Sequence, residues 1–127
     1  MAIEVIPVVA AVDDDFRVRE SLKSLLESAG YAPLVFSSAE EFLQSGTLAA
    51  ATCVIADVRM PGMDGIELQR RIRLERPRLP VILISAHYNP EVRQTAIDEG
   101  AVDVLFKPFD AADLLKTMQS ALIKSRE

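Results

Sequence analysis

The chain has 127 residues, of which 50% are hydrophobic and 26% charged, a composition typical of one globular domain and not of a disordered or collagen-like chain. Its one cysteine and one histidine exclude an internal disulfide and zinc sites built from several thiolates or imidazoles. The net charge of −5 favours neither nucleic acid nor a membrane as a partner, and we interpret residues 1–127 as one cytoplasmic domain.

Five short apolar runs predict five β-strands. None of them alternates with polar residues, so we expect both faces of each strand to be covered, as in a parallel sheet. The first run follows Glu4 rather than basic residues and is too short to cross a membrane, so we interpret it as a buried strand and not as a targeting segment. The five runs are Val5–Val12, Pro33–Phe36, Cys53–Ala56, Val81–Ile84 and Val102–Phe106.

Helical periodicity predicts two helices in the first half of the chain. The first covers Phe16–Ala29. A short second helix follows Ser37–Ser38, which precede Glu40–Glu41 by three residues as in a capping box, and it runs through Leu43. The inward face of the first helix is predicted to hold Val18, Leu22, Leu25, Leu26 and Ala29.

Three more helices are predicted in the second half. One covers Gly65–Glu75 and stops before Pro77. The next begins at Pro90, a residue favoured in the first turn of a helix, and ends at Gly100. The last begins after Asp110, which we expect to be its N-cap.

Five strand–helix units with connections of this length predict an α/β fold. We expect a doubly wound five-stranded parallel sheet of order 2-1-3-4-5 with helices on both faces, as in flavodoxin-like proteins. In such a sheet, ligands bind at the carboxyl ends of the first and third strands, where the strand order reverses. The residues at these strand ends are therefore the candidates for a functional site.

Four of the five strand ends carry polar or charged side chains. The first strand ends in three consecutive aspartates, the third in Asp57, the fourth in Ser85 and the fifth in Lys107. Clustered carboxylates repel one another unless a cation lies among them, and their oxygen atoms suit a hard divalent ion such as Mg²⁺. A metal beside a lysine and a hydroxyl is suited to binding a phosphoryl group. Because the sequence has no glycine-rich phosphate-binding loop, Asp57 is the candidate nucleophile that carries this group.

Four segments of the sequence match a known family. In their order and spacing they resemble, over essentially the whole chain, the receiver domain of two-component response regulators. The segments Ser-Ala-Glu-Glu-Phe at 38–42 and Gly-Ala-Val-Asp at 100–103 most resemble those of FixJ-type transcriptional regulators. The four segments are Val12-Asp13-Asp14 with Val18-Arg19, the loop from Asp57 to Gly65, Ile84-Ser85-Ala86-His87, and Lys107-Pro108-Phe109.

The resemblance implies a magnesium site. Asp14 and Asp57 would ligate Mg²⁺ directly, together with the backbone carbonyl of Arg59, and Asp13 would act through water. The run of three aspartates permits a shifted register. The Val-Arg pair that follows favours the pair at 13 and 14, which leaves Asp15 as a first-turn or capping residue of the first helix.

The resemblance also implies how a phosphoryl group is held. Asp57 would accept it from a sensor histidine kinase, Lys107 would pair with its oxygens, and Ser85 would donate a hydrogen bond to one of them. Lys107 must turn its ammonium back over the site where the fifth strand ends. We therefore predict a cis peptide bond to Pro108, a form that costs only about 0.5–1 kcal/mol before proline.

The implied output is a signalling switch with weak self-catalysed phosphotransfer and dephosphorylation, not an enzyme. Phosphorylation would change the surface formed by the fourth helix, the fifth strand and the fifth helix, which would pair two receiver domains or dock an effector that controls transcription. Receiver domains usually carry Tyr or Phe three residues before the lysine, where this chain has Val104. We therefore expect switching to rest on the loop from Ser85 to His87 and on the fourth helix.

Three other functions fit part of the sequence. A haloacid-dehalogenase-type phosphatase also uses Asp-x-Asp after its first strand, but it wants Thr or Val at the position of Arg17. A pseudo-receiver would be a non-phosphorylated interaction module, which the intact acidic, hydroxyl and lysine positions disfavour. A flavodoxin-like electron carrier is disfavoured because the chain has no Trp and only Tyr31 and Tyr88 to stack on a flavin.

A basic cluster lies in and just after the predicted third helix. Glu67 and Glu75 alternate with it at helical spacing, so we predict a solvated face of salt bridges and no nucleic-acid site on this domain. The cluster comprises Arg70, Arg71, Arg73, Arg76 and Arg78.

Overall fold

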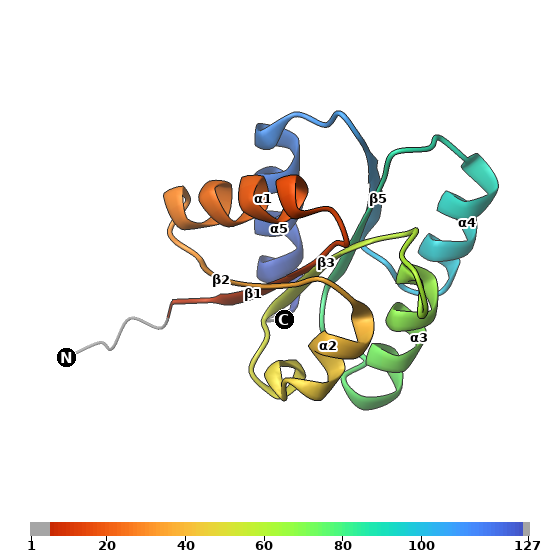
Figure 1. Ribbon diagram of the computed structural model, residues 1–127, viewed down its shortest axis with the longest axis horizontal. Coiled ribbons are helices and arrows are strands. Elements are labelled where there is room, and N and C mark those ends of the chain that lie inside the picture. The colour runs from red at the N-terminus through yellow and green to blue at the C-terminus, as the bar shows by residue number, and fades with distance from the viewer. Residues whose placement is uncertain (1–5, 126–127) are drawn as a thin grey trace.

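The computed structural model describes residues 6–125, in which five parallel strands form one sheet with helices on both faces (Figure 1). The strand order is β2-β1-β3-β4-β5, which confirms the predicted doubly wound topology. The strands are β1 (Val8–Val12), β2 (Ala32–Phe36), β3 (Cys53–Asp57), β4 (Val81–Ser85) and β5 (Asp103–Phe106).

Two layers of helices cover the sheet. Helices α1 and α5 lie on one face, and α2, α3 and α4 lie on the other (Figure 1). The helices are α1 (Phe16–Ser28), α2 (Ala39–Gln44), α3 (Gly65–Glu75), α4 (Pro90–Asp98) and α5 (Ala111–Ser125), with a short 3₁₀ turn at Thr47–Ala49. None of the helices in residues 6–125 is both long and apolar enough to span a bilayer.

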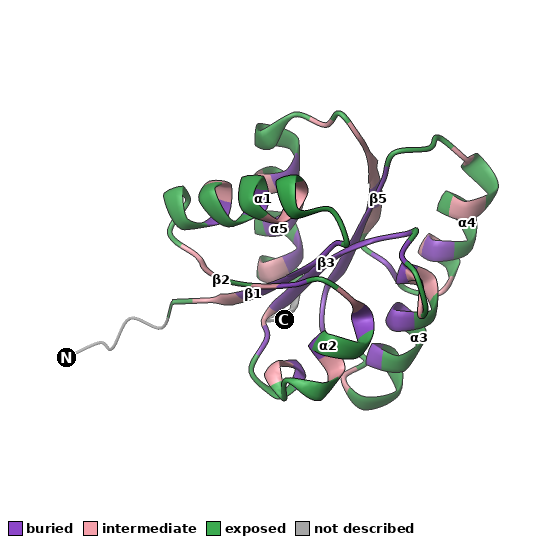
Figure 2. Cartoon of the chain, viewed as in Figure 1, coloured by how far each residue is buried: buried purple, intermediate pink, exposed green. Residues whose placement is uncertain are grey.

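The apolar side chains form one core on each side of the sheet. Leu26 and Met118 are fully buried between the sheet and the α1/α5 layer, while Phe42 and Leu68 are fully buried under the other layer. Each such side chain contributes roughly 1.5–3 kcal/mol of transfer free energy. Figure 2 shows that the buried residues are concentrated on the central strands and on the inward sides of the helices. The buried sheet therefore holds the residues at its carboxyl ends in fixed positions.

The first strand is shorter than predicted. It begins at Val8 because Pro7 has no N–H to donate to the sheet, although the carbonyl of Pro7 still accepts a hydrogen bond from Ala32 N at 2.9 Å. Val5, where the strand was predicted to begin, lies outside the described residues.

The prediction that every strand is covered on both faces holds for β3 and β4, which are buried throughout. It is wrong for the edge strands. In β2, Leu34 is 45% exposed, and Val102, predicted to open the fifth strand, lies before β5 and is 38% exposed. An edge strand has a neighbour on one side only, so its side chains are less completely covered.

The helix ends explain two further differences. Ala29, predicted to face inward on α1, is exposed because it is the C-cap, with its N–H directed at the last carbonyls of the helix. The predicted capping box of α2 is half formed. Ser38 accepts a hydrogen bond from Glu41 N, but the Glu41 carboxylate accepts from Ser37 Oγ.

Candidate functional site

Two adjacent strands bring the acidic residues together. Val12 of β1 and Ala56 of β3 are register partners, so Asp13 and Asp57, which follow them, lie side by side at the carboxyl edge of the sheet. Asp13 and Asp57 are buried, while Asp14 is exposed. One carboxylate oxygen from each of the three residues lies within 4.8 Å of the others.

Lys107 reaches this acidic cluster from the end of β5. Its Nζ donates to Asp57 Oδ2 at 2.9 Å and to Asp13 Oδ2 at 3.0 Å. The Asp13 side chain is fully buried, and those of Asp57 and Lys107 are 11% and 20% exposed. One ammonium group therefore links two carboxylates that water screens poorly.

Burial and charge act on these groups in opposite directions. Burial raises the pKa of the Asp13 carboxyl, while the hydrogen bonds from Asp15 N and Lys107 partly offset the rise. Burial alone would lower the pKa of the Lys107 ammonium. Its hydrogen bonds and its attraction to Asp57 and Asp13 outweigh burial, so the pKa of Lys107 is raised and the group is charged at neutral pH.

Backbone N–H groups fix the second oxygen of each buried carboxylate. Asp57 Oδ1 accepts from Arg59 N at 2.9 Å, and Asp13 Oδ1 accepts from Asp15 N at 2.8 Å. The Asp15 side chain accepts a hydrogen bond from Arg17 N, as the N-cap of α1. The capping role predicted for Asp15 is confirmed, and Asp13 and Asp14 are the residues of the run that lie together with Asp57.

Ser85 lies beside the cluster at the end of β4. It is buried, and its carbonyl accepts a hydrogen bond from Lys107 N at 2.7 Å. Its hydroxyl is bonded to its own loop, because Ser85 Oγ accepts from His87 N and donates to His87 O, both at 3.1 Å. The next residue, Tyr88, places its ring 4.9 Å from that of Phe106.

The peptide bond between Lys107 and Pro108 is cis, as predicted. The carboxyl edge thus gathers the six residues proposed from the sequence around one place, with Arg59 present through its backbone. They are Asp13, Asp14, Asp57, Arg59, Ser85 and Lys107.

The loop that follows Asp57 is closely packed. Gly65 N donates to the carbonyl of Val58 at 3.0 Å, and a Cβ at Gly65 would collide with the backbone carbonyl of Asp57. Asp64 and Glu67 form a complete capping box at the start of α3. Glycine is thus required where the start of α3 approaches the backbone of the candidate nucleophile.

These side chains could hold a metal ion. The three carboxylates carry three negative charges against the single positive charge of Lys107, and every donor atom is oxygen. An all-oxygen, negatively charged set fits a hard divalent cation better than zinc or copper.

Residues 9–119 match the response regulator receiver domain family. The chain belongs to this family. It is 39% identical over 111 residues to the transcriptional regulatory protein FixJ of Bradyrhizobium diazoefficiens, covering 87% of this chain and 54% of FixJ. It spans about half the length of the curated relatives it matches first.

Solved receiver domains have the same architecture. A response regulator receiver domain protein from Clostridium thermocellum superposes with a TM-score of 0.90 at 28% identity, covering 95% of this chain and 98% of that one. The BeF3-activated receiver domain of DrrB superposes with a TM-score of 0.86 at 29% identity, covering 94% and 99%.

Family membership decides between the functions that the sequence left open. A receiver domain of two-component response regulators is a signalling domain rather than a conventional enzyme, so the phosphatase and electron-carrier alternatives are wrong. Relatives that are transcriptional regulators agree with the FixJ-type resemblance.

The receiver's basic face differs from the prediction in its partners. Arg70 forms a two-pronged ion pair with Glu99, at the end of α4, with both contacts at 2.9 Å. Glu67, one of the two predicted partners, is occupied in the cap of α3. Arg73 donates to the Glu99 carbonyl, and Arg76 donates to carbonyls of the segment before β3. Three arginines of the basic cluster thus make tertiary contacts, which helical spacing does not predict.

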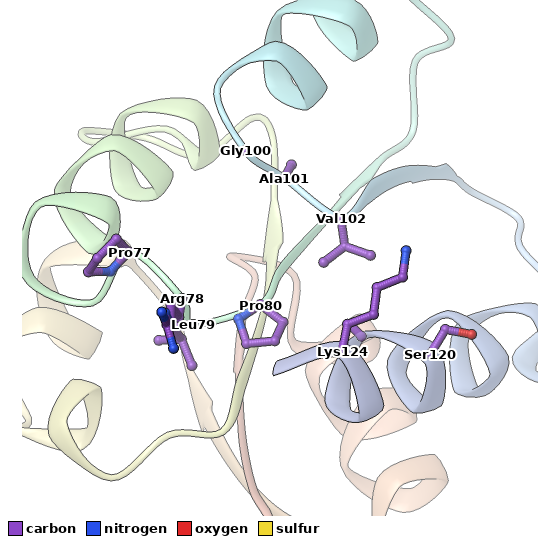
Figure 3. Close-up of a pocket in the computed structure, with 10 residues that line it drawn as sticks. Pro77, Arg78, Leu79, Pro80, Gly100, Ala101, Val102, Ser120 and Lys124 are labelled. Atoms are coloured by element: carbon purple, nitrogen blue, oxygen red, sulfur yellow. The ribbon is translucent and has the colours of Figure 1, made fainter. Parts of the chain in front are cut away.

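A cavity lies at the amino ends of the strands, away from the acidic cluster. Figure 3 shows it between the segments that lead into β4 and β5 and the last turns of α5. It has a volume of about 540 Å³, and its lining includes two basic side chains, Arg78 and Lys124, but no acidic one. The acidic cluster of Asp13, Asp14 and Asp57 lies at the other end of the strands.

Sequence reasoning missed one residue at the site. Glu40 of α2 accepts a hydrogen bond from Met63 N at 3.0 Å, across the loop that follows Asp57. The sequence had marked Glu40 only as a helix-starting residue. Its spacing to Met63 has no local periodicity that could have revealed the contact.

Proposed function

We propose that this receiver domain accepts a phosphoryl group on Asp57 from a sensor histidine kinase, in a reaction that requires Mg²⁺. The observation that carries the proposal is the position of the Asp57 carboxylate, which lies against Lys107 Nζ at 2.9 Å and within 4.8 Å of Asp13 and Asp14. Receiver domains of response regulators pair with histidine kinases, which supports the choice of donor.

The donor set supports a site for Mg²⁺. Asp14 and Asp57 would ligate it directly, with the backbone carbonyl of Arg59, and Asp13 would act through water. When bound, Mg²⁺ neutralises negative charge on the carboxylates and on the phosphoryl oxygens.

The chain's own residues provide the nucleophile and the oxygen contacts. A carboxylate oxygen of Asp57 forms a bond to phosphorus as the bond between phosphorus and the kinase imidazole nitrogen breaks, giving an acyl phosphate and a free histidine. Lys107 stays charged beside the reacting atoms and pairs with the phosphoryl oxygens. Because its backbone is fixed at the end of β5, Lys107 needs little reorganisation to do so.

Ser85 would couple phosphorylation to the output surface. Its hydroxyl must leave the carbonyl of His87 in order to donate to a phosphoryl oxygen. The loop that carries Tyr88 then loses one of its attachments, so the ring contact between Tyr88 and Phe106 is the next to change. Val104 is buried and is too small to make the inward rotation that an aromatic ring at this position would make. The bias toward the active state comes from the new phosphoryl contacts.

We propose that this movement changes the surface of α4, β5 and α5, which then pairs two receiver domains or docks an output domain that controls transcription. Tyr88 is 75% exposed and offers a direct reporter. In a Tyr31→Phe background, beryllofluoride with Mg²⁺ should change the fluorescence of Tyr88, and light scattering should detect any pairing. Unchanged Tyr88 emission together with unchanged amide exchange across residues 86–110 would refute the switching route.

The experiment that tests phosphorylation is intact-mass analysis with acetyl phosphate, in which acetate replaces histidine as the leaving group. We expect a phosphoryl adduct that requires Mg²⁺ and disappears in Asp57→Asn. An adduct that forms equally without Mg²⁺, or that survives in Asp57→Asn, would overturn the proposal.

A further inference from the structure

Glu40 reaches from α2 to the far end of the loop that follows Asp57. We call residues 58–64 the phosphoacceptor loop. Glu40 Oε2 accepts a hydrogen bond from Met63 N at 3.0 Å. The same oxygen lies close over Gly62, since a Cβ built there would be only 2.5 Å from it. Gly62 has a φ of +76°, so the loop turns sharply where the carboxylate meets it.

The rest of the phosphoacceptor loop is attached elsewhere. At its base, Val58 N donates to the Ile84 carbonyl at 2.8 Å, and Gly65 N closes the loop onto Val58. Met60 is buried. Within the described chain, residues 60–63 make a single hydrogen bond, the one from Met63 N to Glu40. Glu40 therefore provides the polar attachment of the outer turn.

The helix that carries Glu40 is itself held firmly. Ser38 caps it through Glu41 N, and the neighbouring side chains Ala39 and Phe42 are fully buried. The Phe42 ring packs edge-on against Phe36, with centroids 5.4 Å apart. The Glu40 backbone is thus anchored on both sides, and its side chain spans the space to the loop.

The charge state suits this contact. The hydrogen bond from Met63 N lowers the pKa of Glu40 below its ordinary value of 4.5, so the side chain is a carboxylate at neutral pH. A charged acceptor makes a stronger hydrogen bond to a backbone N–H than a neutral one does.

We infer that Glu40 is a positioning residue for phosphoryl transfer to Asp57. By holding the outer turn of the phosphoacceptor loop, it keeps the carbonyl of Arg59 where the metal site needs it. Arg59 N donates to Asp57, and the chain from Met60 to Met63 connects the Arg59 carbonyl to the hydrogen bond that Glu40 accepts. This role rests on the proposed function, because it concerns the affinity of that site for Mg²⁺.

The experiment titrates Mg²⁺ at fixed acetyl phosphate and follows the rate of adduct formation by intact mass. For Glu40→Ala we expect the half-saturating Mg²⁺ concentration to rise roughly fivefold, the modest effect of losing a solvent-exposed charge-assisted hydrogen bond. The rate at saturating Mg²⁺ should stay within about twofold of wild type, because Asp57 and Lys107 are unchanged.

Two further variants separate positioning from general destabilisation. Glu40→Gln keeps an oxygen acceptor for Met63 N, so it should recover most of the Mg²⁺ affinity. Glu41→Ala is the matched control. The Glu41 side chain lies on the same helix but accepts a hydrogen bond from Ser37 Oγ rather than from the loop, and the substitution keeps the backbone N–H that donates to the cap. Its half-saturating Mg²⁺ concentration should equal that of wild type.

Amide exchange gives a second measurement that does not need phosphorylation. Glu40→Ala should speed exchange at Met63 N and leave exchange in α5 unchanged. Wild-type Mg²⁺ affinity and wild-type exchange in Glu40→Ala would overturn the role of Glu40 alone. A wild-type protein that takes up no phosphoryl group would instead overturn the proposed function, and the role with it.

Discussion

Replacing Lys107 by Met should destabilise the protein and make its stability depend more strongly on Mg²⁺. The change removes the ammonium that donates to Asp57 and Asp13 at 2.9 and 3.0 Å. It leaves two adjacent carboxylates without their cation, and one of them, Asp13, has a fully buried side chain. Like charges held this close in a poorly screened site repel strongly.

The size of the effect follows from burial. Removing one partner of a buried ion pair costs about 3–5 kcal/mol. Because Lys107 is 20% exposed, and because one carboxyl can take up a proton in the variant, we expect about 2–3 kcal/mol. In a domain of this size 1 kcal/mol corresponds to roughly 4 °C in Tm, so the Tm of Lys107→Met should fall by roughly 8–12 °C.

Thermal unfolding with a chelator and again with Mg²⁺ tests this. With chelator the full loss should appear. Mg²⁺ should restore part of it, because a cation that binds only the folded state stabilises it. Lys116→Met, which changes an exposed lysine of α5, is the control and should leave Tm unchanged. A Tm of Lys107→Met within about 2 °C of wild type in chelator would refute the view that the ammonium compensates the carboxylates.

Three other predictions follow from the burial and packing of Asp13, Gly65 and Cys53. Burial raises the pKa of Asp13 above 3.8, so the charged side chain costs stability at pH 7, and this cost disappears as the pH falls through the folded-state pKa toward 3.8. Without Mg²⁺, urea unfolding should therefore give Asp13→Asn a larger free energy of unfolding than wild type at pH 7. The difference should shrink toward pH 4. Gly65→Ala should cost about 2 kcal/mol in urea unfolding, because its Cβ meets the Asp57 carbonyl, and an unchanged midpoint would contradict this. Burial raises the pKa of Cys53 to about 12, so intact mass should show no alkylation by iodoacetamide at pH 8 unless urea is added.

The sequence was most informative where a local pattern has one structural solution. Continuous apolar runs predicted β3 and β4, and the order common among five-stranded doubly wound sheets predicted the strand order. Because parallel strands end at the same edge, Asp57 and Lys107 could be placed together although 50 residues separate them. The cis bond before Pro108 followed from the need to turn Lys107 toward that edge.

The parts that sequence could not reveal depend on tertiary neighbours. Arg70 pairs with Glu99, 29 residues away, while the local partner Glu67 is used by the cap. Glu40 contacts Met63 because α2 packs beside the phosphoacceptor loop, and no helical periodicity predicts a contact between segments so far apart in sequence. The exposure of Leu34 likewise follows from the place of β2 at the sheet edge rather than from its composition. Such contacts arise only after the layers are assembled.

The central claim is that Asp57, and not a neighbouring aspartate, carries the phosphoryl group. The most direct measurement is to treat the protein with acetyl phosphate and Mg²⁺, reduce the acyl phosphate with borohydride to the alcohol, and locate the modified residue by peptide mass spectrometry. We predict that the modification falls on Asp57 alone and requires Mg²⁺. Modification at Asp13 or Asp14, or no modification of a protein that binds Mg²⁺, would contradict the account.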